Sequence, residues 1–172
     1  MIARLWHDKA MAMTDESKRV EAERVLGEIL RRIGIAGQVR SSEDEERITL
    51  DIAAADEGGL IIGKKGATLD ALQYLVNKIV NRDAVGRKPI LLDTEGYRGR
   101  REESLVELAQ RLGEKVKRTN RAVTMSPMSP HDRRIIHLAL DKFPGVTTRS
   151  EGEGAFRRLM ILPAPDKLDV GG

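Results

Sequence analysis

Hydrophobic side chains recur along this chain with a helical period in some segments and an alternating period in others. The first helical pattern is expected to begin after Thr14, a residue that can cap a helix, and to end at Gly34. Its apolar face comprises Val20, Leu26, Ile29, Leu30 and Ile33. The spacing therefore predicts an amphipathic helix, preceded by a loosely ordered leader of residues 1–13.

Three short segments have the pattern of β-strands. They are residues 38–40, 47–53 and 89–93. In the second segment Ile48, Leu50 and Ile52 alternate with polar side chains, as in a strand with one buried face. The acidic residues 41–46 predict a turn before this strand, and the polar residues 82–88 predict a loop before the third.

Between the second and third of these segments, a glycine-rich stretch separates two helical patterns. An apolar run of about one turn, Gly58–Ile62, leads into the tetrad Gly63, Lys64, Lys65 and Gly66. Apolar positions then recur at helical spacing: Leu69, Leu72, Leu75, Val76 and Ile79. The pattern predicts a helix, a tight basic turn and a second helix.

The chemistry of this turn favours an anionic ligand. Glycine at both ends lets the backbone adopt positive φ and lets another molecule approach without meeting a Cβ atom. The unpaired amides and the positive dipole end of the following helix suit a phosphate, and Lys64 and Lys65 add charge. A Gly-x-x-Gly turn that binds nucleic-acid backbone is typical of KH domains, which this segment resembles.

Two other interpretations of the same residues are open. The turn could be a plain helix–helix connection with solvated lysines. Alternatively, Gly58, Gly63 and Lys64 match the first seven positions of the phosphate-loop pattern G-x-x-x-x-G-K-S/T, and the run 90–93 ends in a carboxylate. Position 65 is lysine, however, so the hydroxyl that holds Mg²⁺ is missing. Leu60, Ile61 and Ile62 also favour burial over an exposed loop.

A second module is expected after a boundary near residues 94–99. A long helix from about residue 98 to 118 is predicted by Leu105, Leu108, Leu112 and Val116. Its arginines, Arg98, Arg100, Arg101 and Arg111, are expected on exposed faces, where such residues usually form charge pairs with glutamates one turn away.

The last part of the chain predicts a strand at 122–125, a helix capped by Ser129 with Pro130 at its first position, and two strands around a glycine-rich turn within 144–163. In the helix, Arg133 and His137 lie four residues apart and hence on one face. An exposed pair of this kind can bind a phosphate, although a surface arginine beside a half-buried histidine is the ordinary explanation.

Composition narrows the function. The 172 residues carry a net charge of only +3, so clustered bases matter more than the total. Aromatic residues are 3% of the chain, which argues against binding by a row of stacked bases. There is no cysteine, which excludes disulfides and thiolate metal sites. No apolar run approaches the length of a membrane span or a signal peptide, so we expect a cytoplasmic protein without membrane insertion.

The order of elements in residues 14–93 resembles a type II KH domain, a three-stranded sheet with helices on one face. Residues 94–163, with the Arg133 and His137 helix followed by the Ser-Glu-Gly-Glu-Gly hairpin, resemble the small α/β domain named for Arg-x-x-x-His. The overall class is thus α+β, with a frayed tail at 164–172. This combination is similar to the bacterial Jag family, also called SpoIIIJ-associated proteins.

The resemblance implies a protein that binds single-stranded RNA, with single-stranded DNA as the alternative. It also implies a role in post-transcriptional regulation linked to cell elongation and division, and pairing with a small single-KH protein. By motif, Gly63, Lys64, Lys65 and Gly66 are expected to bind RNA backbone, with Ile61, Ile62 and Leu69 as candidates for the groove floor or for the core. Arg133 and His137 are expected to contact a second stretch of strand.

Many family members also carry an N-terminal Jag-N domain, and only about a dozen residues precede the KH segment here. The resemblance therefore does not extend to roles that depend on that domain. The alternative function is a protein interaction scaffold that uses a KH-like fold without nucleic acid. We expect no enzyme activity, cofactor or metal site, since the histidines lack the spacing of a helical metal pair. The sequence does not define an oligomeric state.

Overall fold

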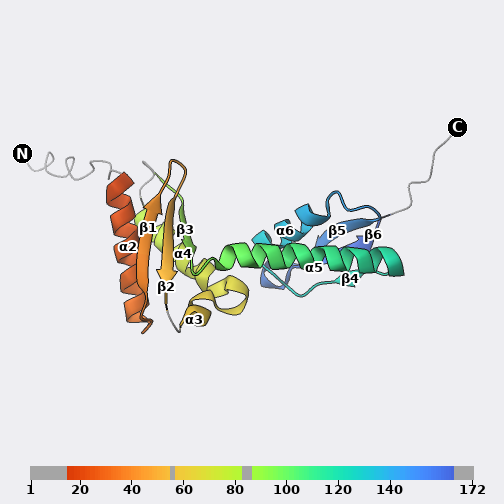
Figure 1. Ribbon diagram of the computed structural model, residues 1–172, viewed down its shortest axis with the longest axis horizontal. Helices are drawn as coiled ribbons and strands as arrows, with labels where there is room; N and C mark the ends of the chain where they lie inside the picture. The colour runs from red at the N-terminus through yellow and green to blue at the C-terminus, as the bar shows by residue number, and fades with distance from the viewer. Residues whose placement is uncertain (1–14, 55–56, 83–86, 165–172) are drawn as a thin grey trace, which may run out of the picture. The chain divides into compact units, whose positions relative to one another are not determined.

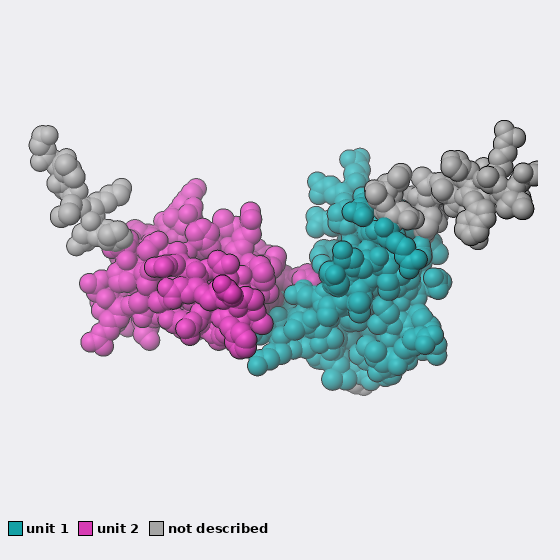
Figure 2. Space-filling view, turned by 180° about the vertical axis from the view of Figure 1, so that it is seen from behind, with its two compact units in different colours: residues 1–97 teal, residues 98–172 magenta. Residues whose placement is uncertain are grey.

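The computed structural model describes residues 15–54, 57–82 and 87–164, which belong to two compact units, 1–97 and 98–172 (Figure 2). Each unit has a hydrophobic core of its own, and both combine helices with strands. This confirms the predicted α+β class. The predicted leader and residues 165–172 of the predicted tail lie outside the described residues.

The first unit is a three-stranded sheet with helices on one face (Figure 1). Its elements are α2 (Asp15–Arg32), β1 (Gln38–Glu43), β2 (Ile48–Ala53), α3 (Gly58–Ile62), α4 (Ala67–Val80) and β3 (Ile90–Asp93). The sheet order is β1-β2-β3, with β2 antiparallel to β1 and parallel to β3. The parallel pair requires a crossover, which α3 and α4 provide.

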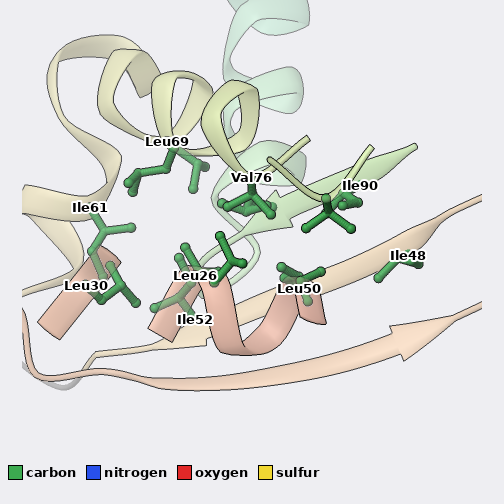
Figure 3. Close-up of a cluster of buried hydrophobic side chains, with 14 of the residues drawn as sticks. Leu26, Leu30, Ile48, Leu50, Ile52, Ile61, Leu69, Val76 and Ile90 are labelled. Atoms are coloured by element: carbon green, nitrogen blue, oxygen red, sulfur yellow. The ribbon is translucent and has the colours of Figure 1, made fainter. Parts of the chain in front are cut away.

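The core of this unit lies between the sheet and the helices (Figure 3). Ile48, Leu50 and Ile52 of β2 are fully buried, so the alternation predicted from the sequence is confirmed. Leu26 of α2 and Val76 of α4 pack into the same cluster. The central strand therefore fixes where both long helices lie.

The helical apolar pattern was partly wrong about which residues are buried. Val20 and Ile33 are each 54% exposed, and Leu75 and Ile79 are 46% and 41% exposed. In α4, the buried stripe is instead Leu69, Leu72, Val76 and Val80. Positions beside a stripe share its hydrophobic period, but only the stripe faces the sheet.

The predicted acidic turn is shorter than expected, because β1 continues to Glu43. The turn begins at Asp44, whose carboxylate accepts hydrogen bonds from the backbone N–H groups of Glu46 and Arg47, each at 2.8 Å. These bonds, the Arg47 bond first, lower the pKa of Asp44. Local bonding thus closes the hairpin between β1 and β2.

The second unit is built from α5 (Tyr97–Thr119), β4 (Val123–Thr124), α6 (Pro130–Leu140), β5 (Val146–Glu151) and β6 (Arg158–Pro163). Its sheet is antiparallel with order β4-β6-β5. The predicted long helix, short strand, capped helix and hairpin are all confirmed. Ser129 accepts a hydrogen bond from the backbone N–H of Asp132, and Pro130 opens α6 as expected.

Arg98 and Arg101 are less exposed than expected of the α5 arginines, and Arg101 forms an ion pair. Its Nη2 atom lies 2.7 Å from Oδ2 of Asp132, whose side chain is only 7% exposed. The pair joins the start of α5 to the start of α6. A buried carboxylate needs such a partner, because an unpaired charge is costly to remove from water.

Candidate nucleic-acid interface

The Gly63–Gly66 tetrad forms a sharp turn between α3 and α4 (Figure 1). Gly63 has φ 66° and ψ −170°, a region that is essentially accessible to glycine alone. Gly66 has φ 86° and Lys65 has φ 57°, so three of the four residues have positive φ. The two helices meet only because this backbone adopts conformations that most side chains disfavour.

Close packing of the turn adds a second requirement for glycine. A Cβ atom at position 63 would lie 2.1 Å from Oγ1 of Thr68. A Cβ atom at position 66 would lie 3.0 Å from the ring of Tyr97, which also packs against the core of the first unit. Thr68 and Tyr97 therefore support the turn from its two ends, and sequence analysis identified neither of them.

The N-terminus of α4 has a glycine as its N-cap residue. Gly66 has no side chain that could accept a hydrogen bond from the first backbone N–H groups of the helix. The backbone N–H of Ala67 bonds to the carbonyl of Lys64, which closes the turn itself. The following amides of the first helical turn have no intrahelical acceptor, so they suit an anion, which the helix dipole also favours.

Lys64 and Lys65 are both exposed on this turn. Within the part of the chain that the structure describes, the Lys64 side chain forms no hydrogen bond or ion pair. Lys65 occupies a left-handed backbone conformation, which is uncommon for a residue with a long side chain. Such local strain is found preferentially at functional sites. The turn thus places a mobile positive charge beside uncapped helix amides.

The structure separates the three residues that we considered for the groove floor. Ile61 and Leu69 are 0% exposed and belong to the hydrophobic core, so of the two alternatives, groove floor or core, the core is the one found for both. Ile62 is partly exposed next to the turn. Ile61 and Ile62 are consecutive residues of α3, so their side chains point in directions about 100° apart. Ile61 faces the core, and Ile62 therefore does not.

The phosphate-loop alternative is not compatible with this geometry. Residues 58–62 form a helix, in which Leu60 and Ile61 donate their backbone N–H groups to the carbonyl of Glu57. The N–H of Gly63 likewise bonds to the carbonyl of Gly59. A phosphate loop needs these amides to surround a phosphate, but here they already donate hydrogen bonds to backbone carbonyls.

In the second unit, Arg133 and His137 line one open pocket on α6, β5 and β6. Its wall consists of Pro130, His131, Arg133, Arg134, His137, Thr148, Ser150, Arg157 and Leu159. The predicted pair therefore does share a face. The three further bases that line the pocket, His131, Arg134 and Arg157, were not assigned to this site from the sequence. Arg157 precedes β6 and reaches the pocket only through the fold.

Arg133 is held by the backbone. Its Nη1 atom donates to the carbonyl of Met128 at 2.6 Å and, more weakly, to that of Arg157 at 3.5 Å. The Nε and Nη2 edge makes no hydrogen bond within the described residues, and this edge can still bind a phosphate with two parallel bonds. The backbone contacts thus orient the guanidinium toward an external ligand.

His137 is fixed in a similar way. Its Nδ1 atom lies 2.6 Å from Oγ1 of Thr148 on β5. The bond leaves Nε2 as the ring atom for an external ligand. Thr148 was not a candidate from the sequence, since it lies eleven residues further along the chain. Only the packing of α6 on β5 brings the two side chains together.

Comparisons with known proteins agree with this two-unit arrangement. Residues 22–90 match the model of the KhpA/KhpB KH domain, and residues 103–163 match the model of the Arg-x-x-x-His domain. The chain is 42% identical over 149 residues to RNA-binding protein KhpB from Clostridium symbiosum. It is 33% identical over 143 residues to RNA-binding protein KhpB from Bacillus subtilis, of whose length it covers 68%.

The chain belongs to the KhpB family. This confirms the predicted resemblance to the Jag family, since both domain types occur in the predicted order. The aligned regions cover 86% and 82% of this chain, but the chain spans only 66% of the length of the Clostridium symbiosum KhpB. RNA-binding protein KhpB from Lactiplantibacillus plantarum, at 30% identity over 133 residues, is covered to 41% of its length.

The described part of this KhpB-family chain contains neither a cluster of metal-ligating side chains nor a membrane-spanning helix. Across residues 15–54, 57–82 and 87–164, no group of three or more His, Asp or Glu side chains gathers as a metal site would require. Among the helices that the structure describes, none is long and apolar enough to cross a membrane.

Proposed function

We propose that this chain binds single-stranded RNA through the Gly63–Gly66 turn and through the Arg133 and His137 face. The observation that carries the proposal is the exposed basic turn at the uncapped N-terminus of α4. Positive φ angles at Gly63, Lys65 and Gly66 let the chain make this turn, in which Lys64 and Lys65 are exposed while Gly66 is buried. The KH type of fold uses such a turn to bind nucleic-acid backbone. The three relatives are themselves named as RNA-binding proteins.

The arrangement favours unpaired over paired strands. A KH turn contacts about four successive backbone positions, and their bases must turn away from a partner strand to enter the adjacent groove. Ile62 is the partly exposed apolar residue beside the turn, so we include it in that groove with Gly63, Lys64, Lys65 and Gly66. Single-stranded DNA is the alternative ligand.

Binding of a labelled uridine oligonucleotide of about 20 residues, measured by fluorescence anisotropy, tests the proposal. For a single strand, each phosphate contact contributes about −0.7 to the slope of log binding constant against log salt concentration. About four contacts at the turn alone therefore predict a slope near −3. The expected result is measurable affinity at about 50 mM salt that falls steeply towards about 200 mM. The same RNA in a duplex is the control, and the deoxyribose oligonucleotide decides between the two polymers. Absent or salt-independent binding would contradict the proposal.

Thr148 gives a prediction for the second face. Its hydroxyl holds Nδ1 of His137, so that Nε2 can carry the proton that a phosphate oxygen accepts. Replacing Thr148 by valine removes one hydrogen bond while keeping the side-chain shape, and we expect about fivefold weaker RNA binding. Thr148→Ser should restore the affinity. The ¹⁵N spectrum of the imidazole should report a changed tautomer balance in the valine variant alone; an unchanged spectrum and affinity would contradict this role.

One observation favours the alternative function of an interaction scaffold. Tyr74, Leu75 and Ile79 are 61%, 46% and 41% exposed along α4, which leaves an apolar face open. Such a face fits a protein partner, including the small single-KH protein that the family resemblance implies. The salt titration separates the two functions, because apolar docking does not weaken as salt rises whereas phosphate contacts do.

The wider role is also part of the proposal. We place RNA binding in the cytoplasm and in post-transcriptional regulation linked to cell elongation and division. The chain acts in this proposal as a binding module without catalysis, cofactor or metal. Since it spans about two thirds of its Clostridium symbiosum relative, the activity and partners of a complete family member are included only as proposals.

A further inference from the structure

A second concave surface lies on α5 of the second unit, and it shares no residue with the Arg133 and His137 pocket. Its lining consists of Leu108, Gln110, Arg111, Leu112, Glu114, Lys115, Arg118 and Phe143. We call it the α5 groove. It combines bases on its walls with an apolar floor, and neither the family comparison nor the proposed function assigns a role to it.

The bases of the α5 groove lie on one helical face. Arg111, Lys115 and Arg118 are separated by four and then three residues, which is the spacing of neighbours along a helix. They extend over about 10 Å at the helical rise. All three are exposed, and none forms an ion pair within the described residues. Glu114 is the one acid in the lining, so the groove has an excess of positive charge.

The floor of the groove is held in place by a glycine. A Cβ atom at Gly113 would lie 3.0 Å from Leu140 and 3.3 Å from the ring of Phe143. The absence of a side chain therefore lets Phe143 approach α5, where Leu108 and Leu112 are partly buried against the same core. The result is a preformed, partly exposed aromatic side chain beside three bases that form no ion pair within the described residues.

We propose that the α5 groove binds a further segment of single-stranded nucleic acid. The three bases contact successive phosphates, and a base packs on Phe143 and the neighbouring leucines. A single strand offers this alternation of charge and flat apolar surface, and stacking on an aromatic ring tolerates any base. The charge excess favours it over a neutral protein segment. This inference rests on the proposed RNA binding and extends the second unit's contact beyond α6.

The test uses the full chain and the same uridine oligonucleotide. In the variant R111A, K115A and R118A, loss of three phosphate contacts should make the salt slope shallower by about 2 and weaken binding at least tenfold at about 100 mM salt. Phe143→Leu keeps an apolar side chain but removes the ring. We expect it to weaken binding about fivefold, with an unchanged salt slope, because stacking is not ionic.

A matched control removes the same charge elsewhere in the second unit. Lys117, Arg149 and Arg158 are exposed and line neither the α5 groove nor the Arg133 and His137 pocket. The combined variant K117A, R149A and R158A should therefore leave the salt slope of RNA binding nearly unchanged. Suppose that the α5 variant has the same RNA affinity and salt slope as this control, while a Lys64 and Lys65 variant binds RNA more weakly than the unmodified chain. The α5 inference is then wrong and the proposed function stands. An acidic protein segment would then be the better occupant. If the unmodified chain binds no RNA, both proposals fail.

Discussion

Replacing Lys64 and Lys65 together by aspartate is expected to weaken binding of single-stranded RNA by about 100-fold or more at low salt. Each lysine can make a charge-assisted bond to a phosphate, and two such bonds contribute about 3 kcal/mol or more. The aspartates also repel the strand beside the N-terminus of α4. Because two phosphate contacts are lost, the salt slope should become shallower by about 1.4.

The fold should tolerate this double change. Aspartate adopts left-handed backbone conformations more readily than most residues, so position 65 can keep φ near 57°. A matched control with the same change in charge is R24E with R40E, since both arginines are exposed on the first unit away from the turn. Circular dichroism checks the fold of each variant. Equal affinity and slope in the Lys64/Lys65 variant and the control would mean that the turn does not bind RNA.

Adding Arg133→Ala to the double variant should weaken binding further. Two separate sites on one chain raise each other's effective concentration, so removal of the second site is measurable even when the first is damaged. The same anisotropy titration measures the difference between the double and the triple variant. No additional loss would indicate that α6 does not contact the same ligand.

Replacing Gly63 by alanine is expected to destabilise the first unit by about 2–6 kcal/mol. The φ 66° and ψ −170° conformation is strained by about 1–3 kcal/mol for any residue with a Cβ atom. The new methyl group would also overlap Thr68, and relieving that overlap costs about 1–3 kcal/mol more. Urea unfolding followed by circular dichroism measures the loss, and RNA binding should fall with it.

Gly59→Ala provides the matched control for Gly63→Ala. Gly59 lies in α3, where a Cβ atom would meet nothing within 4 Å. Alanine favours a helix over glycine by about 1 kcal/mol, so this variant should be as stable as the unmodified chain or slightly more stable. An equal urea midpoint for the two variants would show that the turn is not strained as its backbone angles indicate.

Hydrophobic periodicity predicted most of the elements, since the period of a strand or helix depends on local geometry. The alternation of Ile48, Leu50 and Ile52 identified β2 and its buried face. The helical period found α5, and the capping signal of Ser129 followed by Pro130 found the start of α6. It failed for Val20 and Leu75, whose hydrophobicity fits the helical period but whose positions lie beside the buried stripe. Which side of an amphipathic helix meets a sheet depends on the position of the sheet.

Several candidate binding residues could also be identified from the sequence, because their spacing along the chain is short. The tetrad Gly63–Gly66 could be recognised because a tight turn between helices favours glycine wherever it occurs. Arg133 and His137 could be paired because four residues are about one helical turn. Their role in RNA binding stays a proposal.

By itself, the sequence determined the two modules, their order, the Gly63–Gly66 turn between two helices with its lysines, and the shared face of Arg133 and His137. Only the tertiary structure decided that Ile61 is core while Ile62 is accessible, that Thr148 orients His137, and that Gly113 lets Phe143 reach α5. The first group depends on residues a few positions apart, whose geometry the backbone fixes. The second depends on contacts between elements, which form only when the chain packs.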